Sequence, residues 1–259
     1  MLETNTLREK MHSGQPVIGI WNTLASPLVT EALAVAGLDF QIIDLEHGPF
    51  ILDQIHLHVS ACENNGQCSP LVRIPHLAGW MALQALDQGA HGLVVPHVTT
   101  HDDAFSIGKW SKYPPNGERG FSPFTKAGGF GAWTPEKYSD FANDSLVNVA
   151  IVESKEGLNN LDKLLAEDVA DVIYFGAYDL SQEYGRAGDM KNPELISDVE
   201  KHARKVRDAG KYVGGFVPRS KEELQWNLSL GLNFITFNVD SELIRSSMDA
   251  IVHEFIDLV

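Results

Sequence analysis

Cysteine is almost absent from this sequence. Only Cys62 and Cys68 occur among its 259 residues. Two cysteines supply neither the disulfide framework of a small secreted protein nor a thiolate metal site. Their scarcity favours a reducing compartment, and we expect the protein to be cytoplasmic.

Long hydrophobic runs are absent as well. No stretch of 18 apolar residues occurs, so we expect no membrane-spanning helix. The first residues, MLETNTLREKMHSG, lack the apolar centre of a signal peptide. Both features agree with the expected cytoplasmic location.

Positive charge is scarce too. The 20 lysine and arginine residues are outnumbered by 35 aspartate and glutamate residues, which gives a formal net charge of −15. This excess repels nucleic acids and anionic membranes, and no basic run offsets it locally. We therefore expect neither a nucleic-acid partner nor a membrane partner.

Short apolar runs are regularly spaced along the chain, and a helical pattern follows nearly all of them. Eight runs are found: Val17–Trp21, Phe40–Asp44, Leu71–Ile74, Gly92–Pro96, Val147–Val152, Asp171–Phe175, Tyr212–Val217 and Phe234–Val239. Apolar residues on both faces indicate parallel strands that are covered on both sides. Eight strand–helix units predict an α/β protein with a single (β/α)8 TIM barrel over residues 1–259, in preference to an open doubly wound sheet.

One segment interrupts this rhythm. Residues 114–137 contain nine proline or glycine residues among 24. A long irregular loop inside a compact domain is usually functional or disordered. We expect it to be an active-site lid or a subunit-contact loop.

Charged residues stand where several of the predicted strands end. They are Asp44, Glu46, His47, Arg73, Glu153 and Asp179. In a barrel, these strand ends share one mouth, which is where active sites lie. Carboxylates from separate strands suit a hard divalent cation. The alternative is a structural ion network in which Arg73 pairs with Glu46 or Glu153.

A family resemblance runs through nearly the whole chain. The motifs that carry it are Gly19-Ile20-Trp21, Ala36-Gly37-Leu38-Asp39-Phe40, Ile43-Asp44-Leu45-Glu46-His47, Arg73, Leu86-Asp87-Gln88-Gly89-Ala90, Val94-Val95-Pro96, Tyr113-Pro114-Pro115, Arg119-Gly120, Glu153 and Gly176 with Asp179-Leu180-Ser181. The sequence resembles the class II pyruvate aldolases of the 2,4-dihydroxyhept-2-ene-1,7-dioate aldolase and 2-keto-3-deoxy sugar-acid aldolase type.

The resemblance implies a metal-dependent aldolase. Such an enzyme cleaves a 2-keto-4-hydroxy acid into pyruvate and an aldehyde, through a metal-stabilised pyruvate enolate. The implied cofactor is Mg²⁺, Mn²⁺ or Co²⁺. The implied fold is a modified TIM barrel of the phosphoenolpyruvate/pyruvate type. The implied assembly is a hexamer built as a trimer of dimers, in which the last helix packs on a neighbour.

The resemblance also implies roles for individual residues. Glu153 and Asp179 match the metal ligands of the family. His47 matches the base, which acts through water, and Arg73 matches the residue that stabilises the developing enolate charge. A guanidinium that faces this charge assists the transition state more than the ground state.

Further roles concern the surroundings of the base and the substrate. Asp87 matches an acidic residue that raises the basicity of the histidine, often across a subunit interface. Asp44 is the other candidate for holding the imidazole. Trp21, Ala177 and Tyr178 are the expected substrate contacts.

Two departures from the family pattern leave other reactions open. Ile151 occupies a position that is commonly glutamine, and Tyr178 replaces a small residue. The same enolate site would also support oxaloacetate decarboxylation or another carbon–carbon lyase reaction. A Schiff-base route through Lys155 and a non-catalytic barrel are the remaining alternatives.

Overall fold

The computed structural model describes residues 5–64, 67–76 and 78–259. Its strands are β1 (Val17–Asn22), β2 (Phe40–Asp44), β3 (Ser69–Arg73), β4 (Gly92–Val95), β5 (Val149–Val152), β6 (Val172–Phe175), β7 (Tyr212–Gly214) and β8 (Phe234–Val239). Its helices are α1 (Thr6–His12), α2 (Pro27–Val35), α3 (Ile55–Glu63), α4 (Gly79–Asp87), α5 (His101–Ser111), α6 (Pro135–Ser145), α7 (Lys155–Asn159), α8 (Leu161–Ala166), α9 (Ala177–Glu183), α10 (Pro193–Asp208), α11 (Lys221–Ser229) and α12 (Asp240–Asp257). Two short 3-10 turns, η1 (Leu52–Gln54) and η2 (Gly129–Gly131), complete the set.

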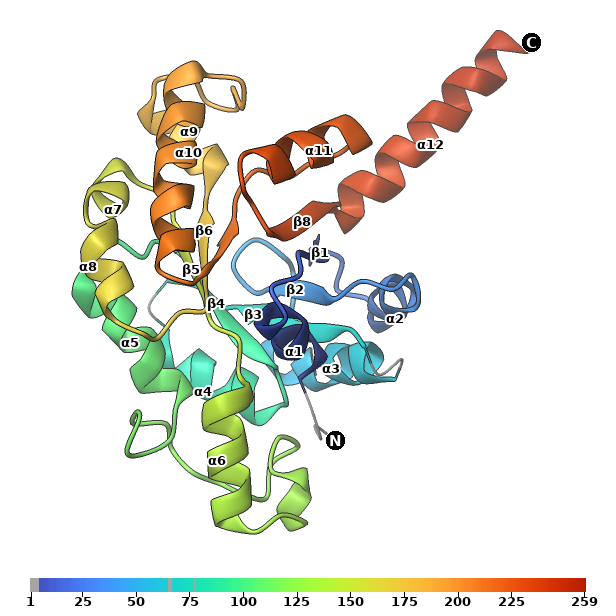
Figure 1. The fold of residues 1–259 in the computed structure, drawn as a ribbon. Helices are drawn as coiled ribbons and strands as arrows, with labels where there is room; N and C mark the ends of the chain where they lie inside the picture. The colour runs from blue at the N-terminus through green and yellow to red at the C-terminus, as the bar shows by residue number, and fades with distance from the viewer. Residues whose placement is uncertain (1–4, 65–66, 77) are drawn as a thin grey trace.

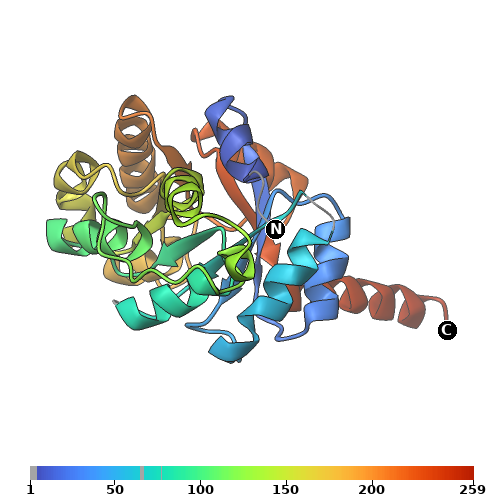
Figure 2. The same cartoon turned by 90° about the horizontal axis from the view of Figure 1, so that it is seen from below.

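The eight strands form one parallel sheet in the order β7-β6-β5-β4-β3-β2-β1-β8. The sheet curls until its two edge strands, β7 and β8, lie next to each other. Asn233, just before β8, joins them: its N–H donates to the carbonyl of Val213 at 3.0 Å, and its Oδ1 accepts from Val213 N at 2.8 Å. This nearly closed barrel, surrounded by helices in Figures 1 and 2, confirms the predicted (β/α)8 fold.

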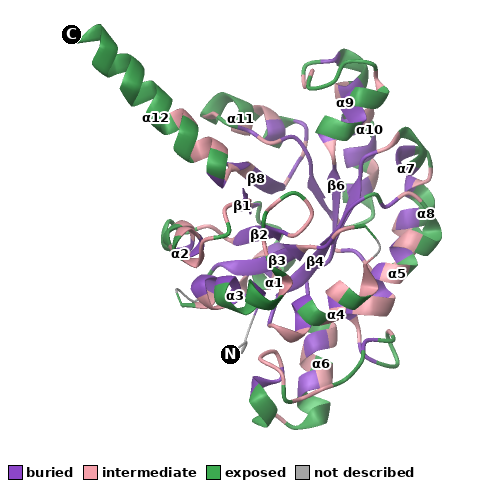
Figure 3. Ribbon diagram, turned by 180° about the vertical axis from the view of Figure 1, so that it is seen from behind, coloured by how far each residue is buried: buried purple, intermediate pink, exposed green. Residues whose placement is uncertain are grey.

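Two apolar cores follow from the alternation of side chains along the strands. One fills the barrel, where Phe40 of β2 stacks on Phe234 of β8 with ring centroids 4.1 Å apart. The other lies between the strands and the surrounding helices. Figure 3 shows the strands as mostly buried. Burial on both faces explains why each strand is a nearly continuous apolar run.

Two polar aromatic side chains and a threonine close the barrel interior near the carboxyl ends of the strands. Tyr174 Oη lies 2.6 Å from Thr236 Oγ1, and Trp21 Nε1 donates to Tyr174 Oη at 3.4 Å. Gly214 of β7 makes room for this arrangement, because a Cβ there would lie 2.2 Å from Cδ2 of Tyr174. The buried hydroxyls of Tyr174 and Thr236 form a hydrogen bond with each other, so neither lacks a partner. Trp21, Tyr174 and Thr236 together close the barrel interior.

The sequence predicts the strands better than the helices. All eight predicted strands are found, and their ends shift by at most three residues. Gly37, Gly210 and Gly231, which follow α2, α10 and α11, have φ of 90°, 75° and 83°, in the left-handed region where glycine commonly ends a helix. Helices α1, α5, α6 and α9 were not predicted. Of these, α9 begins inside what was interpreted as the polar end of the sixth strand.

The irregular segment 114–137 packs at the end of the barrel where the helices finish. Lys126 forms an ion pair with Glu63 at the end of α3, and Ala127 N donates to the carbonyl of Asp87 at the end of α4, at 3.2 Å. Helices of this fold run antiparallel to the strands, so these helix ends lie opposite the barrel mouth.

Among the described residues, no helix combines the length and the apolar composition that a membrane span requires.

We expect Gly214→Ala to lower the free energy of unfolding by about 1–3 kcal/mol, because the added methyl group overlaps the ring of Tyr174. Urea denaturation followed by circular dichroism measures this loss. Gly215→Ala is the matched control, since the nearest atom to its Cβ, Leu232 Cδ1, is 3.4 Å away. Equal stabilities of the two variants would contradict the packing argument.

Candidate active site

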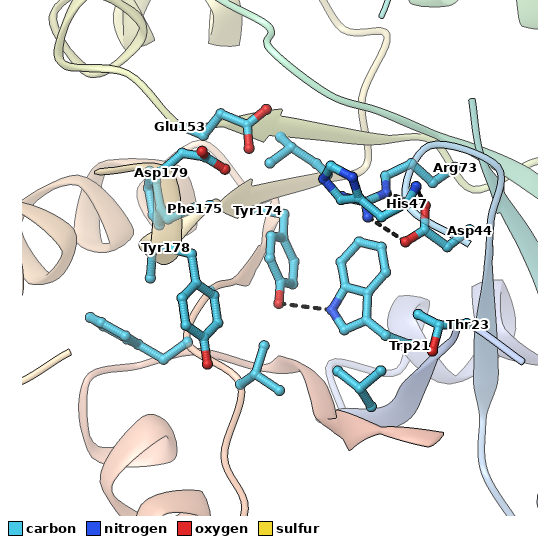
Figure 4. Close-up of a pocket in the computed structure, with 17 residues that line it drawn as sticks. Trp21, Thr23, Asp44, His47, Arg73, Glu153, Tyr174, Phe175, Tyr178 and Asp179 are labelled. Carbon is cyan, nitrogen blue, oxygen red and sulfur yellow. Dashed lines mark hydrogen bonds and ion pairs between the residues drawn. The ribbon is translucent and has the colours of Figure 1, made fainter. Parts of the chain in front are cut away.

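A pocket of about 320 Å³ opens at the carboxyl ends of the strands. It is lined by Trp21, Thr23, Asp44, His47, Arg73, Ile151, Glu153, Tyr174, Phe175, Gly176, Ala177, Tyr178, Asp179, Gly215, Phe216, Val217 and Val239. Figure 4 shows Glu153 and Asp179 on one side, and Arg73, Asp44 and His47 on the other. Every predicted site residue except Asp87 and Glu46 thus lines this pocket.

Asp44 and Arg73 form the most buried ion pair of this pocket. They are register partners at the ends of β2 and β3, so both side chains point into the barrel. Arg73 Nε donates to Asp44 Oδ1 at 2.7 Å, and Arg73 Nη2 donates to Oδ2 of the same carboxylate. The carboxylate is 1% exposed. Such a two-point contact fixes the guanidinium plane.

The Arg73 guanidinium has further contacts. Its Nη1 lies 3.3 Å from Glu46 Oε2, and its Cζ lies 4.4 Å above the ring of Trp21. The alternative ion network that was expected with Glu46 is therefore present. Arginine has five N–H donors, and the contacts with the two carboxylates engage three of them. The remaining donors are available to a ligand in the pocket.

The loop that carries His47 is held by Asp44. Asp44 Oδ1 accepts from Glu46 N at 3.0 Å and from His47 N at 3.2 Å, and its main-chain carbonyl accepts from Gly48 N at 3.0 Å. Asp44 was a candidate for holding the imidazole itself. Its carboxylate binds Arg73 and the main chain of the loop instead, so it positions His47 through the backbone.

Glu153 and Asp179 form the opposite wall. Glu153 is 8% exposed, and burial raises its pKa to about 7, with the nearby carboxylates of Asp179 and Glu46 adding to the effect. Gly176 makes this placement possible, since a Cβ there would lie 2.6 Å from Glu153 Oε2. Asp179 lies in the first turn of α9, where the free main-chain N–H groups favour negative charge.

The donor set of this wall fits a hard divalent cation. Both side chains supply oxygen, the ligand that Mg²⁺ and Mn²⁺ prefer. The pocket is lined by three carboxylates and one guanidinium, so a cation would relieve their repulsion. In the part of the chain that the structure describes, no group of three or more histidine, cysteine or carboxylate side chains could hold a metal ion alone. Glu153 and Asp179 would thus leave other ligand positions to water or substrate.

The other predicted residues divide between the pocket and elsewhere. Trp21, Ala177 and Tyr178 line the pocket, as does Ile151, which presents an apolar surface there. The Tyr178 ring is 46% exposed, and its hydroxyl accepts from Arg219 Nη2 at 2.8 Å. The replacement of a small residue by Tyr178 therefore adds an aromatic wall at the pocket rim.

Asp87 lies at the opposite end of the barrel. It is the last residue of α4, and its Oδ1 accepts from Arg119 Nη2 at 2.8 Å. Within one chain it is separated from His47 by the length of the barrel, because α4 runs antiparallel to the strands. Any contact between Asp87 and His47 would require two copies of the chain.

Some residues that shape the pocket were not predicted from the sequence. Tyr174 forms the floor of the pocket. Its inward orientation could have been predicted, because side chains alternate along a strand and Tyr174 therefore points to the same side as Val172. Thr23 lines the pocket after β1, where its N–H and Oγ1 bind Asp240 Oδ1 at 2.8 and 2.7 Å. No sequence pattern marks that position.

We expect Asp44→Asn to lower the free energy of unfolding by about 3 kcal/mol, because Arg73 would keep its charge in a buried place without its partner. Denaturant titration measures the change. Asp162→Asn is the control, since its pair with Lys205 lies on the surface, where solvent screens the two charges and the pair contributes little to stability. Similar losses in both variants would show that burial does not increase the contribution of the Asp44–Arg73 pair to the free energy of unfolding.

Comparisons with known proteins identify the family of this chain. Residues 17–247 match the family described as HpcH/HpaI aldolase/citrate lyase. A hydroxypyruvate/pyruvate aldolase of Roseovarius nubinhibens is 32% identical over 238 residues, which cover 92% of this chain and 91% of that protein. A 2-keto-3-deoxy-L-rhamnonate aldolase of Shigella boydii is 32% identical over 249 residues, covering 96% and 92%.

A solved structure shows the same architecture. It is a HpcH/HpaI aldolase/citrate lyase family protein from Burkholderia cenocepacia, with a TM-score of 0.89 at 29% identity. The superposition covers 96% of this chain and 99% of that one. The predicted resemblance to the pyruvate aldolases is thereby confirmed, and the chain belongs to the HpcH/HpaI aldolase/citrate lyase family.

Proposed function

We propose that this protein is a divalent-metal-dependent aldolase that cleaves a 2-keto-4-hydroxy acid into pyruvate and an aldehyde. The observation that carries the proposal is the division of the pocket, with the carboxylates of Glu153 and Asp179 facing the guanidinium of Arg73. Aldolase relatives that are 32% identical over most of the chain support the same reaction class.

The residues divide the work of cleavage between two centres. As the bond between carbon 3 and carbon 4 breaks, negative charge moves onto the keto oxygen, where Arg73 stabilises it. His47 takes the proton of the carbon 4 hydroxyl, which becomes the aldehyde carbonyl. The protonated His47 then returns this proton to carbon 3 of the enolate, which becomes pyruvate, and His47 is restored. A divalent cation bound to Glu153 and Asp179 would supply a Lewis acid next to the keto-acid end of the substrate.

Lys155 does not suit a Schiff-base route. Its side chain is exposed, and its Nζ donates to the carbonyl of Glu183 at 3.0 Å and lies 4.0 Å from the centre of the Tyr184 ring. It is not among the residues that line the pocket. A Schiff-base lysine needs burial or a neighbouring cation to lower its pKa, whereas the exposed ammonium of Lys155 has a carbonyl acceptor and an aromatic face as its neighbours.

We also propose that the protein works as a homo-oligomer, a hexamer built from dimers. Helix α12 extends away from the barrel, as Figures 1 and 2 show. Ile244, Met248, Ile251 and Phe255 follow one another at helical spacing along it, and each is more than half exposed. Such an uncovered apolar stripe is typical of a surface that packs on a partner.

A second copy would also supply what one chain lacks near His47. Asp87 and segment 114–137 lie side by side, at the end of the barrel away from the mouth. Phe124 and Phe130 of this segment are about three quarters exposed, at 75% and 74%. We propose that this segment contacts a neighbouring subunit, rather than closing as a lid, and brings Asp87 to the partner's pocket. The free, buried Cys62 and Cys68 agree with a cytoplasmic location.

Removal of divalent metal tests the proposed reaction. Incubation with EDTA followed by desalting should abolish pyruvate formation from 2-keto-4-hydroxy acids, and Mn²⁺ or Mg²⁺ should restore it. A coupled assay for pyruvate measures both. A panel that includes oxaloacetate separates aldol cleavage from decarboxylation by the same site. Full activity after chelation, with pyruvate trapped on Lys155 by borohydride, would exclude the proposed mechanism.

Substitution in α12 tests the proposed assembly. Ile251→Asp should shift the sedimentation velocity of the protein to smaller species, because a carboxylate cannot remain in an apolar contact. Glu254→Gln on the same exposed helix is the control and should sediment as the wild type. Unchanged sedimentation of the Ile251 variant would argue that this stripe is not a subunit contact.

A further inference from the structure

His97 is the most unusual residue around the pocket. It follows β4 and Pro96 and has a φ of 55°, in the left-handed region that a residue with a Cβ rarely adopts. Its side chain is half-exposed, so burial does not force this conformation. Strained backbone that persists at a site points to a role there.

The contacts of His97 show what this conformation achieves. Its main-chain N–H donates to Glu153 Oε1 at 2.7 Å, and its ring nitrogen Nδ1 lies 2.9 Å from the same oxygen. Two nitrogens of one residue therefore contact one carboxylate oxygen. The other ring nitrogen, Nε2, lies 3.7 Å from Glu46 Oε1. The ring is also packed edge-on against His76, with centroids 5.5 Å apart.

The second oxygen of Glu153 faces the opposite direction. Oε2 lies against Gly176, where an added Cβ would come within 2.6 Å of it. Gly176 leads directly into α9, which carries Asp179. With Oε1 held by His97, the oxygen that remains available is the one next to the Asp179 turn.

We infer that His97 is a positioning residue, which fixes the carboxylate of Glu153 so that Oε2 is presented to a divalent cation shared with Asp179. The inference rests on the metal site of the proposed function. The Glu46 carboxylate, which also contacts Arg73, lies near the outer nitrogen of the ring. His97 and Glu46 thereby connect the carboxylate wall of the pocket to its guanidinium wall.

The test compares Mn²⁺ binding to metal-stripped wild type, His97→Gly and His97→Asn, measured by titration calorimetry. Glycine keeps the main-chain donor and accepts a left-handed φ, and asparagine tolerates it too, so both variants should fold. Both lose the imidazole contact with Glu153. We expect Mn²⁺ to bind about 10- to 100-fold more weakly, as is usual when a partner of a metal ligand is removed.

Two further readouts separate positioning from a structural or catalytic role. The thermal midpoint of the stripped variants should stay close to that of the wild type, and kcat should recover once Mn²⁺ saturates them. His101→Asn is the matched control, since His101 also pairs with a carboxylate, Glu167, at 2.7 Å, but lies outside the pocket. Its Mn²⁺ affinity should be unchanged.

The possible failures are distinct. Wild-type Mn²⁺ affinity in both His97 variants would overturn the positioning role and leave the proposed aldolase intact. A kcat that stays low at saturating Mn²⁺ would overturn a role limited to holding Glu153. Absence of Mn²⁺ binding to the wild type would overturn the metal site itself, and the inference with it.

Discussion

The buried pair of Asp44 and Arg73 is the interaction on which the rest of the pocket depends. It ties the ends of two neighbouring strands, and it holds the guanidinium flat above Trp21. The same carboxylate accepts the main-chain N–H groups that shape the loop of His47. An aspartate that satisfies an arginine and a turn at once is difficult to replace, because each partner would lose a different hydrogen bond.

The opposite wall follows another principle, in which carboxylates are brought close together and His97 contacts only one oxygen of Glu153. Glu153 is buried beside other carboxylates, so its charged form is disfavoured until a cation or proton arrives. The two walls are complementary. One is neutralised within the protein, and the other is left to be neutralised by what binds, which fits the anionic keto acid of the proposed reaction only when a cation is present.

The sequence predicted the barrel because strands covered on both faces leave an unmistakable pattern of apolar runs. It also predicted which side chains gather at the mouth, since the strand-end rule needs only the order of elements. Three features could not be predicted from the sequence. The left-handed conformation of His97 depends on a contact with Glu153, 56 residues away in sequence. The α9 helix is too short for a periodic signal, and the separation of Asp87 from His47 depends on helix direction.

The floor of Trp21, Tyr174 and Thr236 closes the barrel beneath the pocket and leaves one way in and out. With the keto-acid half of the substrate against that floor, the aldehyde half lies toward the solvent. The products would then depart in a fixed order, aldehyde first and pyruvate second. Added pyruvate would compete with the substrate for the empty enzyme, whereas added aldehyde would engage only the pyruvate-loaded form. The order of product release would thus follow from the shape of the barrel.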